Sequence, residues 1–172
     1  MRGNGKSSDA EVRLLRTQTH TNDPKKETAM PVKPIPDGYH TVTPFLSVKG
    51  CAQLVDFMKK ALGAEEVMRM PGPAGVVAHA EVNIGNSRVM LSEAMQNPPM
   101  PGSFYLYVAD VDALYKRAVG AGATSQTEPT DQFWGDRMAT VTDAFGNSWS
   151  IATHREDVTP EEMAKRMAAM NR

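Results

Sequence analysis

Hydrophobic and polar positions recur with regular periods along most of the chain. The segment TVTPFLSV at residues 41–48 alternates apolar and polar side chains, which is typical of a half-buried strand. Over residues 50–62 the apolar side chains recur at helical spacing, and Gly63 is placed to end that helix. Three more strand-like runs follow, near residues 64–70, 76–84 and 87–92.

The same order of elements then begins again. A strand is predicted at residues 103–108, a helix at 111–121, and further strands near 123–128, 136–142 and 147–153. Phe45–Val48 precedes Tyr105–Val108 by 60 residues, and Leu54 precedes Leu114 by the same spacing. This repetition predicts two βαβββ modules, residues 41–93 and 103–154.

A single βαβββ module buries its helix on one face of its sheet and leaves the other face bare. Two modules side by side can curl their bare faces into a cup. We therefore expect an α+β fold of two tandem βαβββ modules, which form a curved mixed sheet cup with the helices on its outer face.

The ends of the chain differ from this periodic part. Residues 1–33 contain no apolar run that offsets the cost of ordering, so they are expected to be a disordered leader, or Met30 is the natural start. The folded domain is expected over residues 34–157. The sequence Thr159-Pro160-Glu161-Glu162 is a helix-start signal and predicts a C-terminal helix within residues 158–172.

Charge and composition exclude several classes of protein. Lys and Arg total 19 against 20 Asp and Glu, so no basic field exists that would attract nucleic acid or an anionic membrane. No apolar run approaches the length that crosses a bilayer. The single cysteine, Cys51, excludes an internal disulfide framework, and a reducing, cytoplasmic location is expected.

Three segments resemble a known superfamily. They are LGAEE at residues 62–66, QFWGDRMATVTDAFGNSWSIATH at 132–154, and MPVKPIPDGYHTVTPFL at 30–46. Together with the βαβββ duplication, they resemble the vicinal oxygen chelate superfamily of glyoxalase I, bleomycin-resistance proteins and extradiol dioxygenases. Within it, the chain looks most like the PhnB-type glyoxalase-like branch. The resemblance covers about residues 34–157.

The resemblance implies where a metal would bind. In metal-dependent members, the ligands are His, Glu or Gln on the first and fourth strands of each module. The matching positions in this sequence are Thr43, Ser103, Ser150 and Met90, or Ser92 if the register slips. Hydroxyls and a thioether are poor ligands for Zn²⁺, Ni²⁺ or Fe²⁺, so no metal and no cofactor are expected.

The third predicted strand carries the strongest candidate for chemistry. In AHAEVNI at residues 78–84, His79 and Glu81 share the polar side of the strand. They are candidates for a catalytic pair, a general base and the carboxylate that orients it. The same spacing also fits part of a displaced metal site, or a hydrogen-bonded pair that only lines a wet pocket or faces solvent.

The other candidates are residues that would contact a ligand in the cup. Phe45 and Tyr105 lie on the polar sides of their strands, and Trp134 is interpreted either as a lid over the cup or as a core residue. The ligand-binding set comprises Thr43, Phe45, Met90, Ser92, Ser103, Tyr105, Trp134 and Ser150. Asp136 is interpreted as pinning its loop, and His154 as a surface residue at a strand end.

Two functions remain open on this sequence. One is a protein that binds a small molecule in the cup without the usual metal. The other is an enzyme of the same superfamily, such as a lyase, isomerase or dioxygenase, that is metal-free or uses an atypical metal site. We expect a homodimer with one cup per chain or one per domain-swapped pair, and no nucleic-acid or membrane partner.

Overall fold

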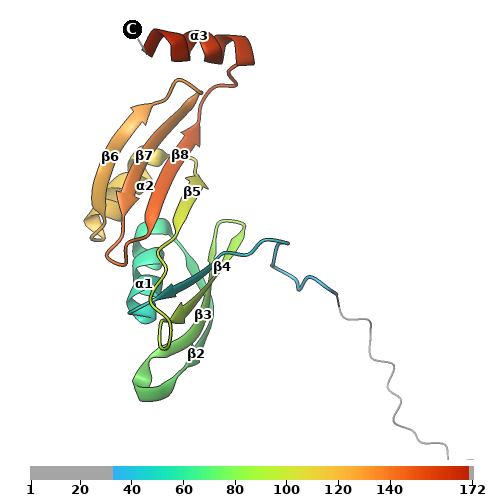
Figure 1. The fold of residues 1–172 in the computed structure, drawn as a ribbon, viewed down its shortest axis with the longest axis vertical. Coiled ribbons are helices and arrows are strands. Elements are labelled where there is room, and N and C mark those ends of the chain that lie inside the picture. Colours follow the sequence, from blue (N-terminus) through green and yellow to red (C-terminus); the bar gives the residue numbers. More distant parts are fainter. Residues whose placement is uncertain (1–32, 171–172) are drawn as a thin grey trace, which may run out of the picture. The chain divides into compact units, whose positions relative to one another are not determined.

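A computed structural model describes residues 33–170 (Figure 1). The first module contains β1 (Phe45–Val48), α1 (Cys51–Phe57), a π-helical turn (Met58–Leu62), β2 (Glu65–Pro71), a 3-10 turn (Pro73–Gly75), β3 (Val77–Ile84) and β4 (Ser87–Glu93). The second module contains β5 (Ser103–Tyr107), α2 (Val111–Gly120), β6 (Thr124–Asp131), β7 (Asp136–Thr142) and β8 (Ser148–His154), and α3 (Pro160–Met170) follows it. The leader predicted over residues 1–33, with the alternative start at Met30, lies outside the described residues apart from Lys33.

Each module forms its own four-stranded mixed sheet. The strand orders are β1-β4-β3-β2 and β5-β8-β7-β6, and the first strand of each module is parallel to the fourth. Phe45 pairs with Met90 in the first sheet, and Tyr105 pairs with Ser150 in the second, so each residue of the first pair lies 60 residues before its equivalent in the second pair. The predicted α+β fold of two tandem βαβββ modules is confirmed.

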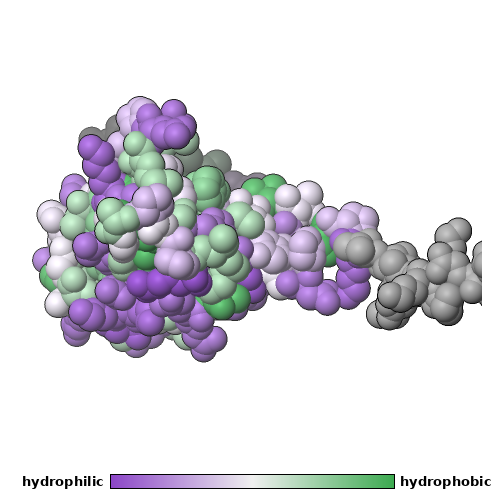
Figure 2. Space-filling view, turned by 90° about the horizontal axis from the view of Figure 1, so that it is seen from below, coloured by the Kyte–Doolittle hydropathy of each residue, from purple (hydrophilic) through white to green (hydrophobic). Residues whose placement is uncertain are grey.

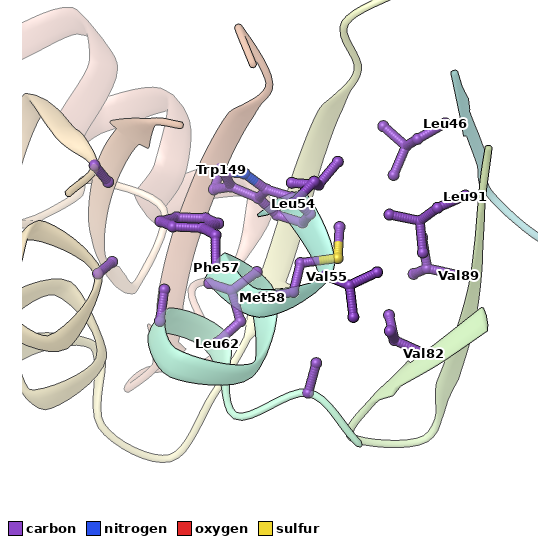
Figure 3. Close-up of a cluster of buried hydrophobic side chains, with 14 of the residues drawn as sticks. Leu46, Leu54, Val55, Phe57, Met58, Leu62, Val82, Val89, Leu91 and Trp149 are labelled. Atoms are coloured by element: carbon purple, nitrogen blue, oxygen red, sulfur yellow. The ribbon is translucent and has the colours of Figure 1, made fainter. Parts of the chain in front are cut away.

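The helix-covered faces of both sheets contribute to one hydrophobic core. Leu54 and Met58 from the first module lie close to Trp149 of β8, and all three are completely buried (Figure 3). Arg117 of α2 donates from Nε to the carbonyl oxygen of Ala61 at 2.8 Å, which ties the two helical segments together. The opposite face of each sheet, which we call its free face, therefore points away from this core.

The turn between β7 and β8 fixes the position of the core tryptophan. Asp143 is buried and accepts hydrogen bonds from Trp149 Nε1 at 3.0 Å and from Asn147 Nδ2 at 2.8 Å. The backbone N–H groups of Phe145 and Asn147 also donate to this carboxylate. Because every buried donor in the turn has a partner, Trp149 can bury its indole N–H without leaving it unsatisfied.

Several predicted boundaries differ from the observed elements. The hydrogen bonds between β1 and β4 end where Met90 N donates to the carbonyl of Pro44, so β1 begins at Phe45. Thr43 therefore lies before the strand. The helix predicted over residues 50–62 changes to π-helical geometry at Met58, and Ala64 N closes it on the Met58 carbonyl. Apolar spacing alone does not distinguish these hydrogen-bonding patterns.

The surface carries no extended apolar belt in the view of Figure 2, where hydrophilic residues are spread among smaller hydrophobic patches. Within residues 33–170, no helix has the length and apolar character required to cross a membrane. The longest of these helices, α3, runs for 11 residues and buries none of its side chains.

Candidate functional site

Three side chains surround the carboxylate of Glu81 on the free face of the first sheet. Arg88 Nη1 lies 2.6 Å from Glu81 Oε2, and the Tyr39 hydroxyl donates to the same oxygen at 2.5 Å. His79 Nε2 lies 3.3 Å from Glu81 Oε1, and its ring stacks on Phe45 with 6.1 Å between the ring centroids. The structure therefore brings the two predicted catalytic residues, His79 and Glu81, into contact.

The carboxyl of Glu81 is held in its ionised form. Its burial opposes ionisation, but the hydrogen bonds from Tyr39, Arg88 and His79 outweigh this effect and lower its pKa. Only 4% of Glu81 is exposed, whereas 26% of the His79 side chain is exposed. A bound molecule would thus meet the His79 imidazole, with Glu81 fixing the orientation of the ring.

A second cluster occupies the free face of the second sheet, with Asp136 at its centre. Asp136 Oδ2 accepts hydrogen bonds from the Tyr105 hydroxyl at 2.9 Å, the Tyr107 hydroxyl at 3.1 Å and Trp134 Nε1 at 3.1 Å. His154 Nδ1 lies 2.8 Å from the other oxygen, Oδ1. From the sequence, Asp136 was interpreted as pinning its loop and His154 as a surface residue, so neither was a candidate functional residue.

The Asp136 cluster also has perturbed acid–base properties. Burial opposes ionisation of Asp136, but the hydrogen bonds from His154, Tyr105, Trp134 and Tyr107 outweigh it and lower its pKa. Burial and the neighbouring Asp136 carboxylate raise the pKa of Tyr105 to about 12. The two tyrosine hydroxyls therefore remain protonated donors, and Asp136 remains an anionic acceptor.

The predicted ligand-binding residues are divided between the two free faces. Phe45 and Met90 are neighbours on the first sheet, as are Tyr105 and Ser150 on the second. Ser92 lies beside Ser47 on the first sheet, and Ser103 beside Ser148 on the second. Thr43 is not in a strand, and its hydroxyl donates to the carbonyl of His40 at 3.1 Å.

Trp134 lies outside the buried hydrophobic core. It is partly buried in the turn before β7, packs edge-on against Phe133 with ring centroids 4.9 Å apart, and holds Asp136 through its indole N–H. One sequence signal pointed to the Asp136 cluster, namely the alternation that placed Tyr105 on the polar side of its strand. That alternation did not indicate that the Tyr105 hydroxyl reaches the carboxylate of Asp136, two strands away.

The family metal does not fit these residues. The positions that correspond to metal ligands carry three hydroxyls and a thioether, from Thr43, Ser103, Ser150 and Met90. In the described part of the chain, no group of three or more His, Cys, Asp or Glu side chains is arranged to hold a metal ion.

Two cavities lie outside the Glu81 cluster. One of about 420 Å³ runs beside β5 and is lined by uncharged residues that include Leu62, Phe104, Tyr107 and Trp149. The other, of about 350 Å³, adjoins Asp136 and is lined by charged groups that include Arg155 and Arg166. Tyr105 and Tyr107 border the first cavity and Asp136 borders the second, so both cavities adjoin the Asp136 cluster.

Two βαβββ modules, each with a helix-covered face and a free face, define a class of small α+β proteins. The sequence model of the Glyoxalase/Bleomycin resistance protein/Dioxygenase superfamily matches residues 39–151. The chain belongs to this superfamily, which confirms the resemblance at that level.

The chain is similar to proteins from several organisms. It is 37% identical over 142 residues to the uncharacterized protein Mb0911c of Mycobacterium bovis, covering 74% of this chain and 92% of that protein. Protein YjdN of Escherichia coli is 24% identical over 144 residues, covering 69% of this chain and 98% of that protein.

Solved structures share the fold. TioX from Micromonospora sp. ML1 matches with a TM-score of 0.56 at 23% identity, covering 66% of this chain and 98% of TioX. A gene product of Arabidopsis thaliana matches with a TM-score of 0.55 at 26% identity, covering 66% of this chain and 98% of that chain. These similarities agree with the observed module order.

Proposed function

We propose that this protein binds a small organic molecule on the free faces of its sheets, and that it does so without the usual metal of the superfamily. The bleomycin-resistance part of the superfamily name offers a precedent for binding. We also propose that the chain belongs to the PhnB-type branch, which the segments at residues 30–46, 62–66 and 132–154 resemble. We further propose that it acts in the cytoplasm. The one cysteine, Cys51, is buried, which suits a protein without disulfides.

The observation that carries the proposal is the pairing of exposed apolar groups with buried charges on the free faces. Phe45, Met70 and Tyr107 are 56%, 50% and 66% exposed. They lie on the same faces as the buried carboxylates of Glu81 and Asp136. Ligand sites in proteins combine apolar surface with a few fixed polar groups in this way.

A second copy of the chain would complete the site. The helix-covered faces share one core, so the two free faces of a single chain point away from each other. Within residues 33–170, β5 pairs with a strand on one side only, and the outer edge of β1 carries just an isolated bridge between Ser47 and Met100. We propose a homodimer in which the first sheet of one copy and the second sheet of the other enclose each cup.

The fluorescent dye anilinonaphthalene sulfonate tests this binding. The dye should bind the folded wild-type protein at a fixed stoichiometry, one molecule per cup. Phe45→Ser and Tyr107→Ser each remove an exposed ring, and each should weaken binding about fivefold, the equivalent of roughly 1 kcal/mol of aromatic contact.

Met170→Ser is the matched control, because Met170 is 69% exposed but lies on α3, which belongs to neither sheet. It should leave the dye affinity unchanged. Equal weakening by all three variants, or no saturable binding, would overturn the proposed function.

An acid–base enzyme is the second candidate, and the contact between His79 and Glu81 favours it. A histidine oriented by a buried carboxylate is a common arrangement for general acid–base catalysis. Mass spectrometry of a ligand recovered after incubation separates the two functions. A binding protein returns the molecule unchanged, whereas an enzyme returns a product.

A further inference from the structure

Two methionine side chains lie next to His79 on the free face of the first sheet. Met70 of β2 is the pairing partner of His79 in β3, and Met68 pairs with Glu81, the next residue of β3 on that face. β2 and β3 lie side by side (Figure 1). Side chains directly opposite each other in an antiparallel pair have Cβ atoms about 5 Å apart, and diagonal neighbours at about 7–8 Å are within reach of a long side chain. His79 therefore has one thioether directly beside it and a second at a diagonal position.

Both thioethers are open to solvent. Met70 is 50% exposed and Met68 is 37% exposed, and the unbranched methionine side chain adapts its position readily. Cys51, the one cysteine of the chain, offers no stronger sulfur ligand. It is completely buried, and burial raises the pKa of its thiol to about 11, so the thiol keeps its proton. The first sheet therefore presents sulfur as thioether and not as thiolate.

One nitrogen of His79 is available as a ligand. Its Nε2 lies 3.3 Å from Glu81 Oε1, and a carboxylate only accepts hydrogen bonds, so Nε2 carries the proton. With that one proton, the imidazole has its lone pair on Nδ1. Within residues 33–170, Nδ1 has no hydrogen-bond partner and is not buried. An ion can therefore approach this nitrogen.

The open side of the imidazole faces the methionines. Phe45 of β1 reaches His79 across β4 and stacks on the ring, with 6.1 Å between the ring centroids. Stacking covers the face of the ring and leaves the lone pair free, because that lone pair lies in the ring plane. The side toward β2, where Met68 and Met70 lie, is the side that Phe45 does not cover.

The carboxylate of Glu81 orients the histidine and is itself fully engaged. Its Oε1 contacts His79, and its Oε2 accepts hydrogen bonds from Arg88 at 2.6 Å and from Tyr39 at 2.5 Å. A hydrogen bond from one imidazole nitrogen to a carboxylate is the usual support for a histidine that binds a metal through its other nitrogen. The groups left for an ion are one imidazole and two thioethers, which are uncharged and soft. Ions that prefer carboxylate ligands, such as Mg²⁺ and Mn²⁺, gain little from them.

We propose that His79, Met68 and Met70 form a binding site for a soft monovalent metal ion, Cu(I) or Ag(I). Thioether sulfur is a ligand that selects Cu(I), and imidazole also binds copper. His79 binds the ion through Nδ1, the two methionines bind it through Sδ, and Glu81 is a positioning residue. The ion enters as a monovalent cation, so no electron is transferred. The site lies on β2 and β3, whereas the metal positions of the superfamily lie on the first and fourth strands of each module. The inference goes beyond the proposed small-molecule binding and does not depend on it.

Competition with bicinchoninic acid, which forms a coloured complex with Cu(I), tests this site in the full-length protein. Ascorbate under nitrogen keeps the copper as Cu(I), and the buffer is held well above the ordinary imidazole pKa of about 6.5. Wild-type protein should take one Cu(I) per chain from the coloured complex, and an excess of Zn²⁺ should not displace it. Met70→Leu and His79→Gln should each weaken binding at least about tenfold, the usual cost of losing even an outer partner of a metal site.

Met167→Leu is the matched control, because Met167 is 48% exposed, close to the exposure of Met70, but lies on α3, which belongs to neither sheet. It should bind Cu(I) as wild type does. Equal affinity in Met70→Leu, His79→Gln and wild type would show adventitious binding to scattered thioethers only and would overturn the proposal. Absence of binding, or displacement of Cu(I) by Zn²⁺, would overturn it as well.

NMR of the wild-type protein gives an answer that does not depend on the folding of a variant. Ag(I), which needs no reducing agent, should shift the Nδ1 signal of His79 and the methyl signals of Met68 and Met70, and leave the methyl signal of Met167 in place. An unmoved Nδ1 signal overturns the proposal. Dye binding in metal-free buffer decides the proposed function separately.

Discussion

Glu81 shows how a single buried carboxylate organises the free face of the first sheet. Burying a charge is costly unless the group is paired and hydrogen-bonded. Here Arg88 supplies the opposite charge, and the Tyr39 hydroxyl and His79 supply further hydrogen bonds. The Arg88 side chain is itself only 10% exposed, and its Nε donates to Asn83 Oδ1 at 2.8 Å.

Glu81→Gln should make the protein less stable at neutral pH and less sensitive to acid. The folded-state pKa of Glu81 lies below its unfolded value of about 4.3, so its contribution is present above that value and is lost as the pH falls through the folded pKa. We expect a loss of about 1–3 kcal/mol at pH 7, because Arg88 then lacks its charged partner. Urea unfolding between pH 7 and pH 3 measures both effects.

Glu128→Gln, at an exposed position of β6, is the control for this measurement and should follow the wild-type curve. If Glu81→Gln also follows that curve, the hydrogen bonds around Glu81 contribute nothing to the folded state.

The sequence predicted part of these clusters. Alternation in β3 placed His79 and Glu81 on one side of the strand, and the structure has them in contact. The alternation did not predict that Arg88 and Tyr39 also contact Glu81. The position of Arg88 depends on the register between β3 and β4, and Tyr39 lies in a segment that has no periodic pattern. Asp136 and His154 were missed for a similar reason: they are paired across two strands and are 18 residues apart in sequence.

At the scale of single elements, the starts of the two module helices are stabilised differently. α2 begins with a side-chain cap, in which Asp110 Oδ1 accepts from Ala113 N at 3.0 Å. α1 has no side-chain cap of its own. Its first N–H groups, at Gly50 and Cys51, donate instead to the carboxylate of Glu93 at the end of β4. An aspartate directly before a helical apolar pattern is a local signal that the sequence carries, whereas Glu93 lies more than 40 residues from the helix start that it caps.

Asp110→Ala should therefore lower the free energy of unfolding by about 0.5–2 kcal/mol, the usual cost of losing an N-cap. Asp110→Ser should recover most of this loss, because a serine hydroxyl also accepts from the N–H groups of the first turn. Chemical denaturation of the two variants measures the difference. Equal destabilisation by Ala and Ser would show that the charge, rather than the cap, is what stabilises the start of α2.

At the scale of the whole molecule, the 60-residue repeat predicted two equivalent βαβββ modules. Phe45 with Met90 and Tyr105 with Ser150 are equivalent pairs in the two modules. The repeat did not predict that the helix-covered faces share one core, with Arg117 of the second module bonded to Ala61 of the first. Periodicity identifies which side of an element is buried, but not what buries it.

The shared core leads to a prediction about how two copies combine. If each cup takes its first sheet from one copy and its second sheet from the other, then a Phe45→Ser chain and a Tyr107→Ser chain will complement each other. In the mixed dimer, one cup carries both substitutions and the other carries neither. Dye titration of mixed dimers, purified with two different tags, should therefore show one wild-type site and one strongly weakened site. If instead each chain encloses its own cup, every cup carries one substitution, and the titration shows no site with wild-type affinity.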